Sequence, residues 1–352
     1  MKFPFISFFS KKIYLYIVTT VIICLLFFSV YIYILAFKPN INNKFDESIY
    51  LKIPTGADFE LLIEVISSDK LLINTNSFIQ LAKKKNLPNH IYPGRYEIRK
   101  KMNNNQLINL LRSGNQKPLN LIFNNIRTKQ RLAQVISRQI EADSSEIINL
   151  LDSIEFMNNY GFSSETIISM FIPNTYEFFW NTSANDFFER MYNEYNRFWD
   201  EKKKQKADEI GLSILEVSIL ASIVDEETII NEEMPKIAGV YINRLKKNYK
   251  LGADPTIKFA LGDFSRKRIL IRDLEIDSPY NTYKYFGLPP GPISIPSIAA
   301  INAVLNYEKH KYLYFCAKED FSGNHNFAKT LIEHNKNAKL YQDALNKNRV
   351  YK

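Results

Sequence analysis

The chain of 352 residues contains only two cysteines, Cys24 and Cys316. They lie in two apolar runs far apart in the sequence, so a framework of disulfide bonds is excluded. The four histidines are scattered, and no His/Cys cluster has the spacing of metal ligands. We therefore expect neither a metal nor a cofactor.

Several common functional motifs are also missing. The 11 glycines form no phosphate-binding loop, and no Gly-x-Ser-x-Gly nucleophile motif occurs. The net charge is +9, but no arginine-rich stripe or nucleic-acid motif accompanies it. We interpret the excess of lysine as solvated surface, and we expect no nucleic-acid partner.

One long hydrophobic run is present, at residues 13–37. About 20 apolar residues suffice to span a bilayer, so this run predicts a transmembrane helix. Lysines precede it at positions 2, 11 and 12, which places the cytoplasmic tail at residues 1–12 and the rest across the membrane. A cleaved signal peptide is the alternative, but the run is long and does not end at small residues. We expect a single-pass protein of the cell (inner) membrane, with its N-terminus cytoplasmic and its catalytic domain extracytoplasmic.

The sequence after the hydrophobic run predicts an α+β fold. A polar, Asn-rich linker at residues 38–48 is followed by two domains. Residues 49–116 form a small α+β domain, with strands at 49–54 and 95–98 and helices at 58–68, 77–84 and 104–112. Residues 117–352 form a larger mixed α+β domain. Within it, residues 185–207 predict one long charged helix, and residues 232–247 predict another helix capped by Asn231.

The most informative segment is an apolar run, residues 214–224, that ends in three carboxylates at 225–227. Helical spacing places Glu227 on the same face as Leu220, Ile223 and Val224, whereas Asp225 aligns with Ser218 and Ser222. A carboxyl group set against hydrocarbon loses hydration, so its pKa rises and it stays protonated near neutral pH. Such a group is a candidate proton donor. A solvated helix end is the alternative interpretation.

Four loops of the C-terminal third are polar, aromatic and punctuated by Pro or Gly. Proline stiffens a loop, and stiff loops that carry Tyr, Asn, Asp and Thr are typical of a preorganised carbohydrate groove. Each loop taken alone is equally consistent with a simple connection. The loops are residues 251–256, 278–283, 287–293 and 323–327.

Together, these segments resemble the endolytic murein transglycosylase (MltG or YceG-like) family. The resemblance covers nearly everything after Lys38 and is strongest from about Ser213 to the end. Asp225, Glu226, Gly252-Ala253 and Asn324 depart from the family pattern. The segments that carry the likeness are LASIVDEET at 220–228, IAGVYINRL at 237–245, DPT at 254–256, SPYNTY at 278–283, GLPPGPI at 287–293, YLYF at 312–315 and EHN at 333–335.

The resemblance implies a lyase that cleaves the MurNAc–GlcNAc bond inside nascent peptidoglycan strands. It implies that Glu227 is the catalytic residue and leaves 1,6-anhydro-MurNAc ends. It also implies that cell-wall synthases are partners and that residues 49–116 are a LysM-like domain. Two roles stay open for this domain: binding glycan, or serving as a packing platform that fixes the height of the site above the membrane. The side chains expected to contact or shape the substrate site are Asn281, Tyr280, Tyr283, Asp254, Thr256, Thr228 and His325.

One carboxyl group is sufficient for this chemistry, because the same group can donate a proton and then remove one. A hydrolase needs a second carboxylate, and Asp254 is the candidate. Two rival functions therefore stay open at this point: a hydrolase of wall glycan, and an inactive scaffold that binds glycan and recruits synthases.

Overall fold

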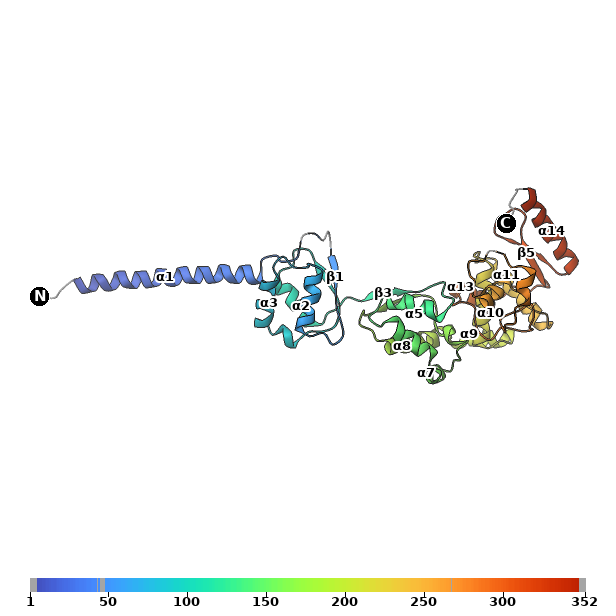
Figure 1. The fold of residues 1–352 in the computed structure, drawn as a ribbon, viewed down its shortest axis with the longest axis horizontal. Helices are drawn as coiled ribbons and strands as arrows, with labels where there is room; N and C mark the ends of the chain where they lie inside the picture. Colours follow the sequence, from blue (N-terminus) through green and yellow to red (C-terminus); the bar gives the residue numbers. More distant parts are fainter. Residues whose placement is uncertain (1–4, 43, 45–47, 267, 348–352) are drawn as a thin grey trace. The chain divides into compact units, whose positions relative to one another are not determined.

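A computed structural model describes residues 5–42, 44, 48–266 and 268–347. The fold is mixed α+β, as predicted (Figure 1). The chain divides into two compact units. The first contains Met1–Leu119 and Glu177–Asn181, and the second contains Asn120–Tyr176 and Thr182–Lys352.

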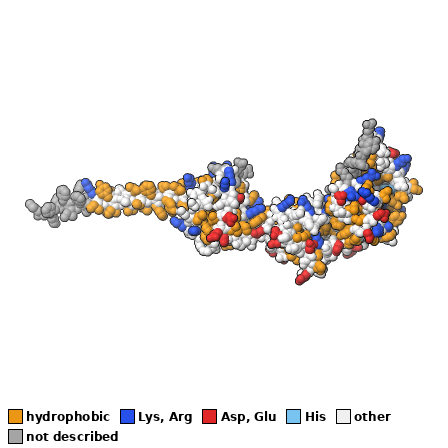
Figure 2. All heavy atoms as spheres, viewed as in Figure 1, with side chains coloured by type: hydrophobic (Ala, Val, Ile, Leu, Met, Phe, Trp, Pro, Cys, Tyr) orange, Lys and Arg blue, Asp and Glu red, His pale blue; other side chains and the backbone are white. Residues whose placement is uncertain are grey.

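The first unit begins with the long helix α1 (Phe5–Ala36). Its part Lys11–Ala36 is long and apolar enough to cross a membrane by length and composition. Figure 2 shows hydrophobic side chains along this helix. At its C-terminal end, the Tyr31 hydroxyl donates to Gln80, and the carbonyl of Leu35 accepts a hydrogen bond from Asn104. The helix is therefore fixed to the α+β part of its own unit.

That part has the order β1 (Ser48–Ile53), α2 (Phe59–Ser68), α3 (Thr75–Lys84), the 3₁₀ turn η1 (Leu87–Asn89), β2 (Gly94–Arg99) and α4 (Asn104–Ser113). The two strands pair antiparallel, from Ser48 opposite Arg99 to Ile53 opposite Gly94. Asp58, Asn74 and Asn103 cap the three helices with their side chains. The apolar faces of these elements enclose one core.

The predicted linker, residues 38–48, is in part built into this core. Ile41 is only 2% exposed. The amide of Asn40 donates to the carbonyl of Asn74 and to the side chain of Asn104, which explains how a polar segment can be buried. Residues 43 and 45–47 lie outside the described residues.

The strands β3 (Leu119–Ile122) and β4 (Thr175–Phe178) pair with each other, and their residues 120–122 and 175–176 belong to the second unit. Five helical segments belong to the same part of the second unit: α5 (Lys129–Ser137), α6 (Ser144–Asp152), α7 (Ile154–Asn159), η2 (Ile167–Met170) and α8 (Ala184–Phe198). The prediction of one helix over 185–207 was wrong, because a second helix, α9 (Glu201–Ile210), starts after Trp199. Trp199 is buried, and Asp200 caps α9 by accepting the N–H of Lys203.

Helix α10 (Ile214–Glu227) lies at the centre of the remaining part and packs against α9, α11 (Met234–Lys246), α12 (Asp254–Leu261) and α13 (Ile298–Leu305). Residues 217–224 of α10 are all buried. These eight consecutive side chains are buried because other helices pack around α10, whereas a surface helix buries only one face. The N-cap of α11 is Glu233 rather than the predicted Asn231. The chain ends with the antiparallel pair β5 (Tyr314–Ala317) and β6 (His325–Ala328), followed by α14 (Leu331–Lys347).

Candidate active site

Glu227 is the last residue of α10, and it is half-buried. The hydroxyl of Tyr241 on α11 donates a 2.6 Å hydrogen bond to its Oε1. Tyr241 is 1% exposed, and its ring meets Phe315 of β5 edge to face at 5.8 Å. The position of the Glu227 carboxyl is therefore fixed by a second helix and a strand.

Burial raises the pKa of Glu227 to about 7, from an ordinary value of 4.5. The negative charge of Asp254 raises this pKa as well, whereas the hydrogen bond from Tyr241 and the charges of Arg244 and Lys258 lower it. Loss of hydration is the largest cause. A substantial share of Glu227 therefore carries a proton at neutral pH, as a general acid requires.

The two neighbouring carboxylates have structural partners. Asp225 accepts from the backbone N–H of Ser297 at 2.9 Å and from its hydroxyl at 2.6 Å, at the start of α13. Glu226 forms a two-pronged ion pair with Arg127, at 2.9 and 2.7 Å. Glu227, by contrast, is hydrogen-bonded by the neutral phenol of Tyr241, and of the three carboxylates in this run it alone lines both cavities described next.

Two cavities meet at Glu227. The first has a volume of about 750 Å³ and is lined by Arg127, Thr228, Asn231, Ser297 and others. The second has a volume of about 510 Å³ and is lined by Tyr241, Arg244, Asp254, Tyr283, Tyr314 and others. Glu227 and His325 line both cavities. A long, linear ligand that occupies both cavities would pass these two side chains.

The second cavity brings together four of the predicted site residues: Glu227, Asp254, Tyr283 and His325. Asp254 begins α12 and is exposed, and its Oδ1 accepts the hydroxyl of Tyr283 at 2.5 Å. Burial and the bond to Asp254 raise the pKa of the Tyr283 hydroxyl, which keeps that hydroxyl protonated. Arg244 contacts the backbone carbonyls of Leu313 and Leu251, so it holds the cavity wall together.

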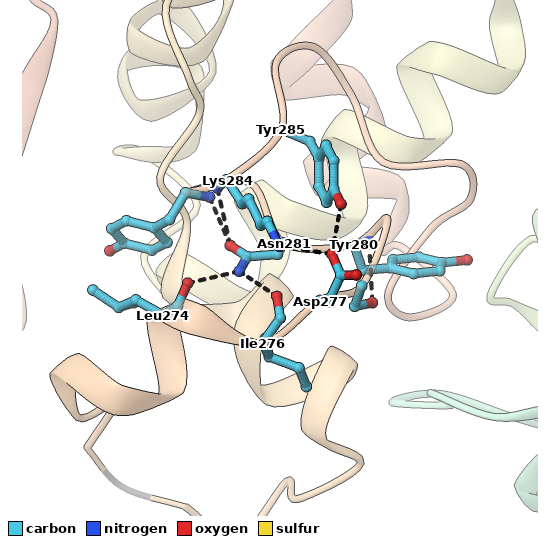
Figure 3. A network of polar contacts seen from close by, with 9 residues as sticks. Leu274, Ile276, Asp277, Tyr280, Asn281, Lys284 and Tyr285 are labelled. Atoms are coloured by element: carbon cyan, nitrogen blue, oxygen red, sulfur yellow. Dashed lines mark hydrogen bonds and ion pairs between the residues drawn. The ribbon is translucent and has the colours of Figure 1, made fainter.

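Asn281 does not line either cavity. It is fully buried, and its amide donates to the carbonyls of Leu274 and Ile276, both at 2.8 Å (Figure 3). Its Oδ1 accepts the backbone N–H groups of Tyr283 and Lys284. Every hydrogen-bonding position of this side chain is thereby engaged, so its role in the structure is to hold the loop that carries Tyr283.

Thr256, Tyr280 and Thr228 also have local partners. The hydroxyl of buried Thr256 donates to the carbonyl of Ala253 at 2.7 Å, which stabilises the start of α12. Tyr280 packs on Phe259 at 4.6 Å and lines neither of the two cavities. Thr228 is buried beside the first cavity, and its hydroxyl accepts the N–H of Ile230.

His325, the first residue of β6, is held by Glu233. Its Nδ1 lies 2.6 Å from one carboxylate oxygen, and its backbone N–H donates to the other oxygen at 2.8 Å. Sequence reasoning missed Glu233 and Tyr241. Tyr241 belongs to the IAGVYINRL segment, but nothing in its spacing reveals a contact 14 residues away from Glu227. In the part of the chain that the structure describes, no three His, Cys, Asp or Glu side chains gather as metal ligands.

Comparison with known proteins places these features in a family. The model of the YceG-like family matches residues 51–340. An endolytic murein transglycosylase of Bacillus subtilis is 30% identical over 319 residues, which cover 85% of this chain and 86% of that protein. One from Streptococcus pneumoniae is 39% identical over 111 residues, 30% of this chain and 20% of that protein.

A solved crystal structure is also similar. It is that of a YceG-like protein from Listeria monocytogenes, with 30% identity and a TM-score of 0.56. The match covers 82% of this chain and 98% of that chain. Both the sequence and the fold therefore lead to one conclusion: the chain belongs to the YceG-like family.

Proposed function

We propose that this protein is a membrane-anchored lytic transglycosylase that cleaves peptidoglycan strands between MurNAc and GlcNAc. The observation that carries the proposal is the position of Glu227, a carboxyl group with a pKa of about 7 where two cavities meet. The relatives named endolytic murein transglycosylase support it.

The chemistry requires one proton donor. Protonated Glu227 donates to the glycosidic oxygen as the bond to the anomeric carbon of MurNAc breaks. The positive charge that develops on this sugar is stabilised by its own acetamido group. The hydroxyl on the sixth carbon of the same sugar then closes onto the anomeric carbon, gives up its proton and forms the 1,6-anhydro end.

The two cavities support cleavage within a strand. A glycan that continued on only one side of the acid would need only one cavity. Here the cavities of about 750 and 510 Å³ share the acid, so sugars on both sides of the scissile bond have room. Tyr283, Asp254, Thr228 and His325 are the substrate contacts that we propose, whereas Asn281, Thr256 and Tyr280 shape the loops.

A wall-glycan hydrolase is the second candidate. Asp254 supports it, because this carboxylate lines the same cavity as Glu227 and raises its pKa. Hydrolysis requires a second carboxylate that activates water or attacks the sugar. The bond from Tyr283 restrains Asp254 and reduces its availability for that role.

Mass spectrometry of the products tests the proposal. The full chain in detergent is incubated with purified glycan strands, and Glu227→Gln is the matched control. We expect anhydro-MurNAc ends from the wild type and no cleavage by the Gln variant. Reducing ends would establish the hydrolase, and binding without any cleavage by the wild type would leave an inactive scaffold.

The anchor and the small domain complete the proposal. Helix α1 crosses the cell membrane with Lys11 and Lys12 on the cytoplasmic side, as its length and apolar surface allow. The small domain formed by β1, α2, α3, β2 and α4 is LysM-like, and the enzyme ends nascent strands beside cell-wall synthases. Protease digestion of intact spheroplasts tests the topology: the C-terminal part should be degraded from outside.

A further inference from the structure

His325 and Glu227 are the two residues that line both cavities. They come from different elements, His325 from β6 and Glu227 from α10. A ligand that occupies both cavities therefore passes both the Glu227 carboxyl and the His325 side chain. Imidazole is the side chain most often used to move protons near neutral pH.

The tautomer of His325 is set by Glu233. One oxygen of the Glu233 carboxylate accepts the backbone N–H of His325, and the other lies 2.6 Å from Nδ1. An ionised carboxylate can only accept hydrogen bonds, so Nδ1 carries the hydrogen. In the neutral ring, Nε2 then has a free lone pair.

The surroundings keep this arrangement in place. The side chains of His325 and Glu233 are 13% and 10% exposed, and the ring of Phe315 meets the imidazole edge to face at 5.3 Å. Glu233 itself lines neither cavity, so it lies behind the imidazole. Among the described residues, Nε2 has no hydrogen-bond partner, which leaves it available to a ligand in the cavities.

We propose that His325 is a second catalytic residue, the general base of the ring-closing step, and that Glu233 is its positioning residue. The inference rests on the proposed function. In the first step, Glu227 gives its proton to the leaving oxygen, and the C1–O4 bond breaks. In the second step, O6 of the same MurNAc bonds to C1, and the O6 proton passes to Nε2. The imidazolium is stabilised by Glu233, and solvent returns the proton to Glu227.

The experiment compares His325→Ala with Glu233→Gln in the full chain in detergent, on purified glycan strands. Each variant should lower kcat on the order of 100-fold with KM nearly unchanged, because general-base catalysis contributes about 10²–10⁴-fold. The Gln side chain can donate to Nδ1, which moves the ring hydrogen to Nε2 and blocks it. Added imidazole should restore part of the activity of His325→Ala but none of that of Glu233→Gln.

The products give an independent readout. Without the base, water competes for the anomeric carbon, so the ratio of reducing to anhydro ends should rise in His325→Ala. Glu319→Gln is the matched control, since this exposed carboxylate bonds Asn326 on the same hairpin and does not contact His325. We expect wild-type kinetics from it.

Three results would overturn the inference: wild-type kcat in both variants, a rise in KM alone, or activity lost without rescue and with an unchanged product ratio. Thermal unfolding identifies a variant that fails to fold. In that case the kinetics of the other variant test the role of His325. If the wild type itself made only reducing ends, the proposed transglycosylase activity would be refuted. This outcome differs from the three results that refute the role of His325 alone.

Discussion

The phenol of Tyr241 donates a hydrogen bond to the Glu227 carboxyl, 2.6 Å from oxygen to oxygen, and so connects α11 to the end of α10. This contact favours the ionised form of Glu227 and opposes the larger effect of burial on its pKa. It also leaves the other carboxyl oxygen to carry the proton. The pair therefore determines both the strength of the acid and the direction in which it donates.

Replacing Tyr241 by Phe should shift the pH profile of cleavage upward. Without the hydrogen bond the pKa of Glu227 rises above about 7, so the loss of activity with increasing pH begins at a higher pH. The rate at neutral pH should fall on the order of tenfold, because a hydrogen bond to a developing charge contributes about 1.5–3 kcal/mol. Initial rates from pH 4 to 9 measure both effects.

Tyr96→Phe is the control for that measurement. Tyr96 is also fully buried and donates to a backbone carbonyl, that of Tyr92 at 2.9 Å, but it lies in the first unit. Its loss should lower stability and leave the pH profile unchanged. An unshifted profile in Tyr241→Phe would show that this hydroxyl does not tune the acid.

Glu227→Gln should stabilise the fold above pH 7. The pKa of Glu227 is about 7 in the folded protein and 4.5 as its ordinary value, so between these values the folded state holds more protons than the unfolded state. Stability from this group is therefore present below about pH 4.5 and is lost as the pH rises to about 7. The Gln variant retains the bond from Tyr241 and avoids the buried charge. We expect a gain of up to about 3 kcal/mol at pH 8.

Thermal unfolding at pH 4 and pH 8 checks the sign of this effect. The difference between Glu227→Gln and wild type should be small at pH 4 and favour the variant at pH 8. A variant that is equally stable or less stable at pH 8 would mean that Glu227 is fully hydrated, and the proposed acid would lose its physical basis.

Asp225→Ala should lower stability and leave the chemistry intact. Asp225 accepts two hydrogen bonds from Ser297 at the N-terminus of α13, and the loss of both costs about 1–3 kcal/mol. Denaturant unfolding gives the change in free energy, and the cleavage rate per folded molecule should stay within a few-fold of wild type. A loss of rate comparable to that of Glu227→Gln would make Asp225 part of the catalytic machinery.

Asn281→Ala should lower the stability of the fold and should affect glycan binding less directly. Four backbone groups bond to this buried amide, so its removal leaves several of them unsatisfied and costs about 3 kcal/mol or more. Calorimetric unfolding and glycan binding by the same preparation separate the two effects. Unchanged stability with lost binding would restore the prediction that Asn281 contacts the substrate.

Much of the fold could be predicted from local patterns. The strand at 49–54 and the helices at 58–68 and 104–112 lie within one or two residues of their observed ends, because polar caps and apolar periodicity define them. The helix break at Trp199 was missed, since the charged residues around it suit a helix throughout. What ends the helix there is the burial of one indole ring and a cap at Asp200.

Helical spacing alone does not distinguish Glu227 from Asp225. Leu220, Ile223 and Val224 are buried as predicted, but so are Ser218 and Ser222 on the opposite side. The difference between Asp225 and Glu227 therefore arises from their partners on α13 and α11. Asn281 illustrates the same limit, because its type and loop suit a sugar contact, yet its amide bonds the backbone.

The sequence alone determined the apolar N-terminal helix, the α+β class and the acid that ends a hydrophobic run, because each depends on neighbours within a few positions. Only the tertiary structure decided that Tyr241 holds this acid, that Glu233 orients His325, and that two cavities share Glu227 and His325. These relations join residues that lie 14 to almost 100 positions apart, and packing alone brings them together.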